Sequence, residues 1–322
     1  METEIDKIIK EKYESGVFQG AVLVARNGEI IYNDGVGYCD TQQSKSITSD
    51  TRMYLASVSK PFTAMAVMIL KERNKLSYDD KLIQYIPEFS NFGSEITLRH
   101  LLTHTSGIPD YWDLGIGKAG LTNEDVLKSI LKHQHLDFVP GTKYSYSNSG
   151  YVVLALIVEQ VAKQPFSEFI SSNIFLPLKM NDSFVCTSLP PPSTNRAIGI
   201  DDSGQISDYD ILTTGDGGIF STTSDLFLWD QALYNNTLIA ESTLKEAFEP
   251  MKLNDGSTSN YGFGWELPNN DAVAHTGSLN GFGSGIYRDL RSKTLLVMLS
   301  NKGESFEVKD IAQPIFEVLF SR

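Results

Sequence analysis

Three short polar motifs in this sequence carry the side chains that acyl transfer to a serine requires. They are Ser57-Val58-Ser59-Lys60, Tyr146-Ser147-Asn148 and His275-Thr276-Gly277, in that order along the chain. Serine is a weak nucleophile until a neighbouring base takes its proton. A lysine three residues further along a helix lies on the same face as the serine and can be that base. The motifs therefore predict a nucleophilic serine that needs no histidine base.

The Ser-x-x-Lys spacing alone is weak evidence, because it occurs three times in this sequence. Ser129 and Lys132 lie in a segment with an amphipathic pattern, so a solvated helix face explains them. Ser242 precedes Thr243-Leu244-Lys245 and has the position of a helix cap. These two occurrences predict no chemistry.

Ser57 and Lys60 differ from the other two pairs in their surroundings. They open the segment 62–70, which is apolar almost all round and is therefore expected to be buried. A lysine at the start of a buried helix loses hydration unless other groups compensate for it. A capping serine with a lysine that extends to solvent is the alternative interpretation.

The other two motifs also have plain structural interpretations when each is taken alone. Tyr146-Ser147-Asn148 precedes an apolar helix over 149–163, so it fits a helix-entry loop with Asn148 or Ser149 as the cap. His275-Thr276-Gly277 ends a predicted strand. Beside a reactive serine, however, the phenol of Tyr146 can relay a proton and the carboxamide of Asn148 can orient a substrate amide.

Composition describes an ordinary globular protein and excludes some partners. The 322 residues are 41% hydrophobic and 21% charged, enough for a substantial core in one large or two moderate domains. The net charge of −13 is not offset by any long Lys/Arg run, which argues against nucleic acid or an anionic membrane as partner. We expect a small molecule or a short peptide as substrate. The sequence does not indicate an oligomeric state.

The cysteine content and the hydropathy argue against three further features: a disulfide framework, a zinc ribbon and a membrane-spanning helix. Cys39 and Cys186 are far apart, so we expect two reduced thiols and neither a disulfide framework nor a zinc ribbon; no cofactor is indicated. The longest apolar run, residues 151–158, is too short to cross a bilayer. Residues 1–16 lack the apolar stretch of a secretory signal, so we expect a cytoplasmic protein or one whose leader has been removed.

The pattern of apolar residues predicts strands near both ends of the chain and helices between them. Asn27-Gly28 within residues 20–38 is a strong hairpin signal, and further strands are expected at 261–267, 272–277, 283–289 and 294–301. Helix-spaced residues at 3–14 and 307–320 can cover one face of that sheet. Further helices are expected at 57–73, 97–104, 122–133, 149–163, 166–175 and 221–233. Residues 1–55 and 210–322 are therefore predicted to form an α/β domain, and 56–209 a mainly helical one.

With these motifs in hand, the chain resembles the serine β-lactamase and penicillin-binding-protein superfamily. It is most similar to the branch of class C β-lactamases, D-Ala-D-Ala carboxypeptidases, D-aminopeptidases and related esterases, whose three elements are Ser-x-x-Lys, Tyr-x-Asn and Lys/His-Thr/Ser-Gly. The stretches 96–110, 215–226 and 261–265 also look like this family. The resemblance implies an antiparallel sheet flanked by the terminal helices, an inserted helical domain, and a site in the cleft between them.

The same resemblance implies roles for individual residues. Ser57 would form an acyl-enzyme, with either Lys60 or Tyr146 as the base; the sequence leaves this open, because the two titrations are coupled. Substrate binding would fall to Asn148, Thr276, Gly277 and Ser278. The backbone N–H groups of Ser57 and Ser278 would form the oxyanion hole. His275 would add a proton or a hydrogen bond near Tyr146.

Two departures from the family bear on the substrate. His275 stands where many β-lactamases have lysine, so the positive charge that would hold a substrate carboxylate is weaker. The missing export signal is the second. We therefore expect a hydrolase of small esters, amides or D-amino-acid peptides, with a true β-lactamase, a D-Ala-D-Ala carboxypeptidase or a penicillin-binding sensor without turnover as alternatives. Tyr111 and Trp112 are expected either to line the substrate pocket or to pack on the helical domain.

Other chemistries have less support. His100 and His104 have the spacing of a zinc motif but lack its glutamate, so both are interpreted as structural. There is no Gly-x-Ser-x-Gly elbow, no Gly-x-Gly-x-x-Gly and no Walker motif. A lipase-like hydrolase and a nucleotide-binding enzyme are therefore not indicated.

Overall fold

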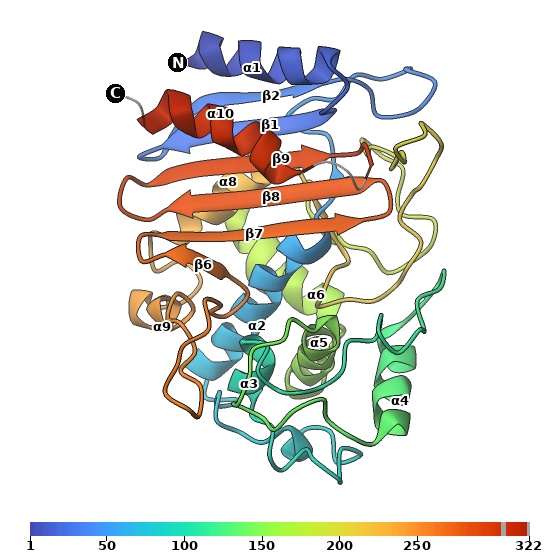
Figure 1. Cartoon of the computed structure of the whole chain (residues 1–322), viewed down its shortest axis with the longest axis vertical. Helices are drawn as coiled ribbons and strands as arrows, with labels where there is room; N and C mark the ends of the chain where they lie inside the picture. Colours follow the sequence, from blue (N-terminus) through green and yellow to red (C-terminus); the bar gives the residue numbers. More distant parts are fainter. Residues whose placement is uncertain (304–306, 321–322) are drawn as a thin grey trace.

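A six-stranded antiparallel sheet joins the two ends of the chain (Figure 1). The structure is a computed structural model that describes residues 1–303 and 307–320. The strand order is β2-β1-β9-β8-β7-β6, and every neighbouring pair is antiparallel. The strands are β1 (Gly20–Arg26), β2 (Glu29–Val36), β6 (Glu266–Asn269), β7 (Ala272–Leu279), β8 (Phe282–Asp289) and β9 (Thr294–Ser300).

The first hairpin forms where the Asn-Gly signal predicts it. Asn27 and Gly28 connect β1 to β2 with φ values of 53° and 78°. Two-residue turns of this kind need positive φ at both positions, which asparagine and glycine tolerate best. β1 then pairs with β9, from the other end of the sequence, so the N- and C-terminal segments share one sheet.

Alternate residues of the central strands pack against different layers, as a pleated strand requires. On one face Val22, Val24, Leu296 and Met298 form a core with helices α1 (Glu2–Glu14) and α10 (Val308–Phe320). On the other face Leu23, Val297 and their neighbours join the main core, where α8 (Thr223–Ala232) contacts β1 and β9. The two terminal helices therefore cover one face, and the rest of the protein covers the other.

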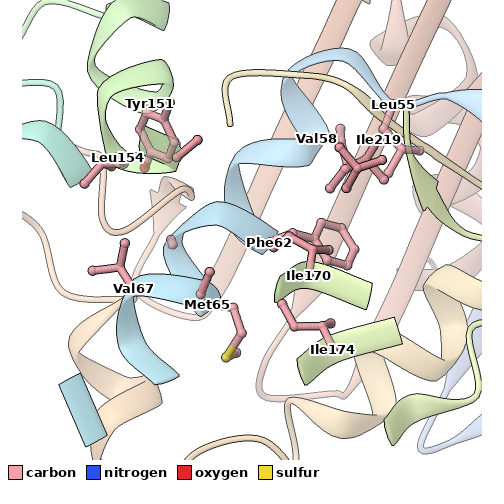
Figure 2. Packing of buried hydrophobic residues seen from close by; sticks show 14 of the residues in the cluster. Leu55, Val58, Phe62, Met65, Val67, Tyr151, Leu154, Ile170, Ile174 and Ile219 are labelled. Atoms are coloured by element: carbon pink, nitrogen blue, oxygen red, sulfur yellow. The ribbon is translucent and has the colours of Figure 1, made fainter. Parts of the chain in front are cut away.

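A helical region extends from the second face of the sheet (Figure 1). Its central element is α2 (Lys60–Glu72), in which every residue from Lys60 to Leu70 is buried. The other helices are α3 (Leu98–Leu102), α4 (Asn123–His133), α5 (Asn148–Ala162), α6 (Phe166–Ile170), α7 (Leu176–Leu178) and α9 (Glu241–Glu246). Figure 2 shows Leu55 and Val58 beside Ile219, and Phe62 beside Ile170 of α6. This packing fixes the start of α2, where Ser57 and Lys60 lie.

The predicted fold class is confirmed, with local corrections. Residues 261–265 form a turn instead of a strand: β6 begins at Glu266, and the turn packs on α2, where a Cβ at Gly264 would lie 2.8 Å from the carbonyl oxygen of Lys60. The predicted cap at Ser242 is also wrong, because α9 begins at Glu241 after Ala240. The domain division at residues 55/56 and 209/210 stays a prediction.

A second, three-stranded sheet was not predicted from the sequence. It has the order β3-β5-β4, with β3 (Met53–Tyr54), β5 (Ile219–Ser221) and β4 (Phe184–Val185). Strands of two or three residues are too short to show a period of two. This small sheet holds the segment immediately before Ser57, since the N–H of Leu55 donates to the carbonyl of Ile219.

No helix within residues 1–303 and 307–320 is long and apolar enough to span a membrane. Cys39 and Cys186 are both buried free thiols, as expected for cysteines far apart in the sequence.

Candidate active site

Ser57 lies in a tight turn between the small sheet and the buried helix α2. It belongs to a short 3₁₀ helix, Ala56–Ser59, that runs directly into α2. The preceding residue, Ala56, has a φ of 45°, in the left-handed region that a residue with a Cβ adopts at an energetic cost. The Oγ of Ser284 on β8 donates to the carbonyl of Leu55 over 2.6 Å and so ties this turn to the main sheet. The strained turn is therefore held from both sides.

Lys60 is completely buried one turn below Ser57, and its ammonium has three acceptors. Its Nζ lies 3.0 Å from Oγ of Ser57, 2.8 Å from Oδ1 of Asn148 and 2.9 Å from the carbonyl oxygen of Asp216. Burial lowers the pKa of Lys60 to about 8, although the charges of Asp216 and Asp110 act in the opposite direction. A neutral Lys60 is thus accessible near neutral pH, with its lone pair free to accept the Ser57 proton.

Asn148 is the first residue of α5, and its carboxamide is already engaged by the protein. Its Oδ1 accepts from Lys60, while its backbone N and its Nδ2 both donate to Oδ2 of Asp110, over 2.6 and 2.9 Å. The carboxamide therefore orients Lys60 directly. Asn148 also lines a small cavity beside Ser57, and its contact with a substrate amide stays a prediction.

The phenol of Tyr146 lies on the other side of Ser57. Its ring centroid lies 4.8 Å from Nζ of Lys60, and Tyr146 lines the same cleft as Ser57. Burial raises the pKa of Tyr146 well above its ordinary value, and the hydrogen bond with Ser57 offsets only part of that rise. The three groups proposed to share a proton, Ser57, Lys60 and Tyr146, are thus brought together from the 3₁₀ helix Ala56–Ser59, from α2 and from the loop before α5.

The ring of His104 packs against the ring of Tyr146. The two rings are 4.2 Å apart, and the backbone N–H of Ser147 donates to Nδ1 of His104 over 3.1 Å. Burial and the charge of Lys60 lower the pKa of His104 well below its ordinary value, so the ring is neutral. His100 lies elsewhere, in the capping box that begins α3. Both histidines are therefore structural, as interpreted from the sequence, but His104 also positions the site.

His275 is buried with both ring nitrogens occupied. Nδ1 lies 2.7 Å from the carbonyl oxygen of Thr276, and Nε2 lies 2.8 Å from the hydroxyl of Tyr261. A carbonyl oxygen only accepts, so Nδ1 carries the proton and Tyr261 donates to Nε2. Burial, assisted by the charge of Lys60, lowers the pKa of His275 to about 3. At neutral pH this side chain is uncharged, and its nitrogens face Tyr261 and its own strand instead of Tyr146.

The strand that carries His275 passes directly against the Ser57 turn. A Cβ added to Gly277 would lie 2.7 Å from the backbone N of Ser57 and 2.7 Å from the carbonyl of Leu55, so only glycine fits there. Thr276, Gly277 and Ser278 line a cleft of about 500 Å³ together with Ser57, Tyr146 and His275. Ser57 and Ser278, whose backbone N–H groups would form the oxyanion hole according to the family resemblance, both line this cleft, and the oxyanion hole itself stays a prediction.

Tyr111 and Trp112 both line a smaller cavity of about 60 Å³ that also includes Ser57 and Asn148. Tyr111 is fully buried, and its hydroxyl donates to Oδ2 of Asp216 over 2.8 Å. Trp112 is 41% exposed. Both residues thus lie in a pocket wall, as the first of the two expectations states. The burial of Tyr111 also agrees with the second, that it packs inside the protein.

Sequence reasoning missed four residues that position this site: His104, Asp110, Asp216 and Tyr261. Asp110 and Asp216 lie inside stretches that resemble the family, but nothing in the sequence pairs them with Asn148 or Tyr111. Tyr261 falls in a segment predicted as strand, which gives no reason for a bond to His275. The other two Ser-x-x-Lys pairs are surface features, as expected: Lys132 is exposed, and Lys245 pairs with Glu241.

An antiparallel sheet covered by the terminal helices, with Ser57 in a cleft beside a helical region and Lys60 buried behind it, defines the β-lactamase and transpeptidase fold. The chain belongs to the Beta-lactamase family of serine hydrolases, whose sequence profile matches residues 5–320. It is 34% identical to penicillin-binding protein 4* of Bacillus subtilis, over 96% of this chain and 74% of that protein. The penicillin-binding protein of Bacillus halodurans is 26% identical, with a TM-score of 0.84, over 98% of this chain and all of that one. A class C β-lactamase with 23% identity shares the fold, with a TM-score of 0.83, over 99% of this chain and 96% of that one.

Proposed function

We propose that this protein hydrolyses small esters, amides or D-amino-acid peptides through a covalent acyl-enzyme on Ser57. The observation that carries the proposal is the 3.0 Å contact between Oγ of Ser57 and Nζ of a fully buried Lys60. A lysine with three acceptors, a lowered pKa and no exposure to water is suited to exchange a proton with its neighbour.

In the first step, Oγ of Ser57 bonds to the substrate carbonyl carbon while its proton moves to neutral Lys60. The carbonyl oxygen becomes an oxyanion, which the N–H groups of Ser57 and Ser278 stabilise; each such donor contributes about 3–4 kcal/mol. The bond to the leaving amine or alcohol then breaks, and that group takes a proton from Lys60, directly or through the Tyr146 hydroxyl. The products are an ester on Ser57 and a free amine or alcohol.

We assign Lys60 as the base because burial makes the lysine easier to deprotonate and the tyrosine harder to deprotonate. Burial favours the neutral form of each group, and the neutral form is the active base for lysine but the inactive one for tyrosine. The pKa of Lys60 is lowered to about 8, whereas the pKa of Tyr146 is raised well above its ordinary value. Tyr146 therefore acts as a protonated relay. His275, whose nitrogens are both engaged, acts as a positioning residue that holds Tyr261 and the strand.

In the second step, water hydrolyses the acyl-enzyme. The sequence is the reverse of acylation, with water in the place of the amine or alcohol. A water molecule attacks the acyl carbonyl carbon and gives a proton to neutral Lys60, by way of Tyr146. The bond between that carbon and Oγ of Ser57 breaks, and Oγ recovers its proton. A carboxylic acid leaves and the site returns to its starting state.

Neutral His275 favours ester and amide substrates over β-lactams and D-Ala-D-Ala peptides. Those two substrate classes carry a carboxylate, which a fixed positive charge at this position would bind. The pKa of about 3 leaves His275 without that charge at neutral pH. The likeness to penicillin-binding proteins favours a second candidate, a protein that is acylated by penicillin and turns over slowly or not at all.

A chromogenic panel tests both candidates. We would measure nitrocefin, short-chain p-nitrophenyl esters and D-amino-acid p-nitroanilides with the native protein and with Ser57→Ala. The proposal predicts turnover of esters or anilides that Ser57→Ala abolishes. Equal rates for the two proteins would reject Ser57 as the nucleophile. A stable mass adduct with penicillin and no turnover of any substrate would support the second candidate instead.

A further inference from the structure

Glu266 places a half-buried carboxylate in the wall of the main cleft, and the proposed mechanism gives this group no role. It is the first residue of β6, the edge strand beside β7. Its carboxylate has no hydrogen bond and no ion pair with any residue in 1–303 or 307–320. Burial raises the pKa of this carboxyl, and no neighbouring charge or donor offsets the rise. A ligand that brings a positive charge there compensates an unpaired, partly desolvated anion.

The pairing of β6 with β7 places Glu266 on the face that carries two other cleft residues. Glu266 pairs with Ala274 of β7, and directly paired residues of antiparallel strands point to the same face. Every second residue of a strand shares a face, so Thr276 and Ser278 lie on it too, and both line the cleft. Ser278 is four positions beyond Ala274, so at about 3.4 Å per residue Glu266 is offset from Ser278 by roughly 13 Å along β7. A ligand group at Glu266 is therefore several bonds from the carbonyl that Ser57 attacks.

Two spaces meet at Ser57, and the proposed reaction decides which of them receives the leaving group. Asn148 lines the cavity of about 60 Å³, whereas Tyr146 and Glu266 line the cleft of about 500 Å³. The leaving amine or alcohol takes its proton from Lys60, directly or through the hydroxyl of Tyr146. Because Tyr146 lines the cleft and not the small cavity, the leaving group extends into the cleft, on the side of Glu266.

Tyrosine rings near Glu266 add surfaces that attract a cation. The ring centroid of Tyr261 lies 5.9 Å from that of Tyr144 and 6.2 Å from that of Tyr146. Burial and then the charge of Glu266 raise the pKa of Tyr144 to about 12, so this phenol lies near the carboxylate. Tyr144 is 37% exposed and can be reached by a ligand. The faces of aromatic rings bind ammonium groups, and several rings together favour quaternary ones.

The lining of the cleft offers no free positive side chain among residues 1–303 and 307–320. Lys309 lines it, but its ammonium pairs with Glu307 over 2.6 Å. His275 is neutral, because burial lowers its pKa to about 3. The unpaired carboxylate of Glu266 therefore decides which sign of charge this part of the cleft accepts.

We infer that the leaving group of the substrate carries a positively charged nitrogen several bonds from the scissile bond, and that Glu266 binds this cation beside Tyr144. Esters of amino alcohols, esters of quaternary-ammonium alcohols and amides of diamines have this chemistry. The inference rests on the proposed acyl-enzyme function and specifies the leaving group of its substrate.

The test compares esters that differ in one atom of the leaving group. We would measure kcat/KM for the acetate ester of hexanol with a trimethylammonium group at its far end. The matched neutral ester carries a tert-butyl group in that place, so carbon replaces nitrogen and the shape is kept. The native protein is expected to prefer the cationic ester at least about tenfold, as for a hydrogen-bonded or paired charge. A third ester, with a primary ammonium group there, shows which form of the cation is preferred.

Variants of the two cleft glutamates locate the cation. Glu266→Gln is expected to remove the preference, and Glu266→Lys is expected to reverse it. Glu307→Gln, which changes the carboxylate that already has Lys309 as its partner, is the matched control and should keep the preference. The melting temperature of each variant reports whether it folds. If the preference survives Glu266→Gln, or is lost in Glu307→Gln instead, Glu266 does not bind the leaving group and the inference is wrong.

A binding assay covers the case of slow turnover. The free cationic alcohol is expected to protect Ser57 from labelling by a fluorophosphonate at about tenfold lower concentration than the free neutral alcohol. This difference should disappear in Glu266→Gln. A native protein that treats the cationic and neutral compounds equally, while Ser57 is still labelled, overturns the inference and leaves the acyl-enzyme intact. Absence of labelling at Ser57 in the native protein would reject the proposed function itself.

Discussion

One carboxylate oxygen of Asp110 accepts two hydrogen bonds from Asn148, one from its backbone and one from its side chain. The other end of the same carboxamide holds Lys60 over 2.8 Å. Asp110 thus positions Lys60, the proposed base, through Asn148, and it does not itself line the substrate cleft. This chain of contacts connects α2 to the start of α5. A substitution of Asp110 should therefore lower catalytic activity as well as stability, whereas loss of an aspartate that only packs would lower stability alone.

Asp110→Asn is expected to weaken both the fold and the site. The new carboxamide cannot accept two bonds at one oxygen with the strength of a carboxylate, and hydrogen bonds to charged groups contribute about 1.5–3 kcal/mol each. We expect the free energy of unfolding to fall by about 2 kcal/mol or more and kcat to fall with it, since Lys60 loses its orientation. Chemical denaturation and steady-state kinetics measure the two effects. Asp79→Asn, which removes an exposed pair with Arg99, is the matched control and should change stability by no more than about 1 kcal/mol.

The pH dependence follows from the pKa of about 8 for Lys60. The active base is the unprotonated amine, so kcat/KM should rise about tenfold per pH unit below that value and level off above it. His275, with a pKa of about 3, should add no step between pH 5 and 7. A profile on a neutral ester between pH 5 and 9.5 checks this. A flat profile, or a single step near 6.5, would show that a different group sets the rate.

Lys60→Arg separates positive charge from the ability to accept a proton. Arginine keeps the charge but does not deprotonate in this pH range, so it cannot serve as the base. General-base catalysis contributes about 10²–10⁴ in rate, and we expect acylation of Ser57 to slow by that factor. Stopped-flow release of p-nitrophenol measures the step. Lys245→Arg, in the surface Ser-x-x-Lys pair, should leave the rate unchanged.

Gly277→Ala tests the close approach of β7 to the Ser57 turn. The new Cβ would lie 2.7 Å from backbone atoms of Leu55 and Ser57, so the strand must move away. Displacing one oxyanion donor lowers kcat by about 10²–10³. Gly150→Ala on α5 is the control, because its Cβ would meet nothing closer than 3.5 Å and alanine favours a helix. An active Gly277→Ala would mean that Ser278 donates nothing to the reaction.

The sequence predicted those parts of the fold whose signals are local. The Asn27-Gly28 turn, the apolar-rich run of β1 and the all-round apolar pattern of α2 each depend on neighbours a few residues away. The relation of Ser57 to Lys60 is of this kind too, because one helical turn sets it. These features could therefore be predicted before any coordinates.

The contacts that complete the site join residues that lie far apart in the chain. Tyr111 meets Asp216 across 105 positions, and Asn148 meets Lys60 across 88. No period or spacing encodes such pairs in a single sequence. The turn at 261–265 shows a different limit: its aromatic and glycine residues fit a strand locally, but packing on the start of α2 decides its conformation.

The most direct test of the account is the mass of the intact protein after a brief reaction with a fluorophosphonate, followed by peptide mapping. We predict one adduct, on Ser57, that is absent from Ser57→Ala and that forms at least about 10²-fold more slowly in Lys60→Arg. An adduct on any other residue, or equal labelling rates in the native protein and Lys60→Arg, would contradict the claim that Lys60 activates Ser57.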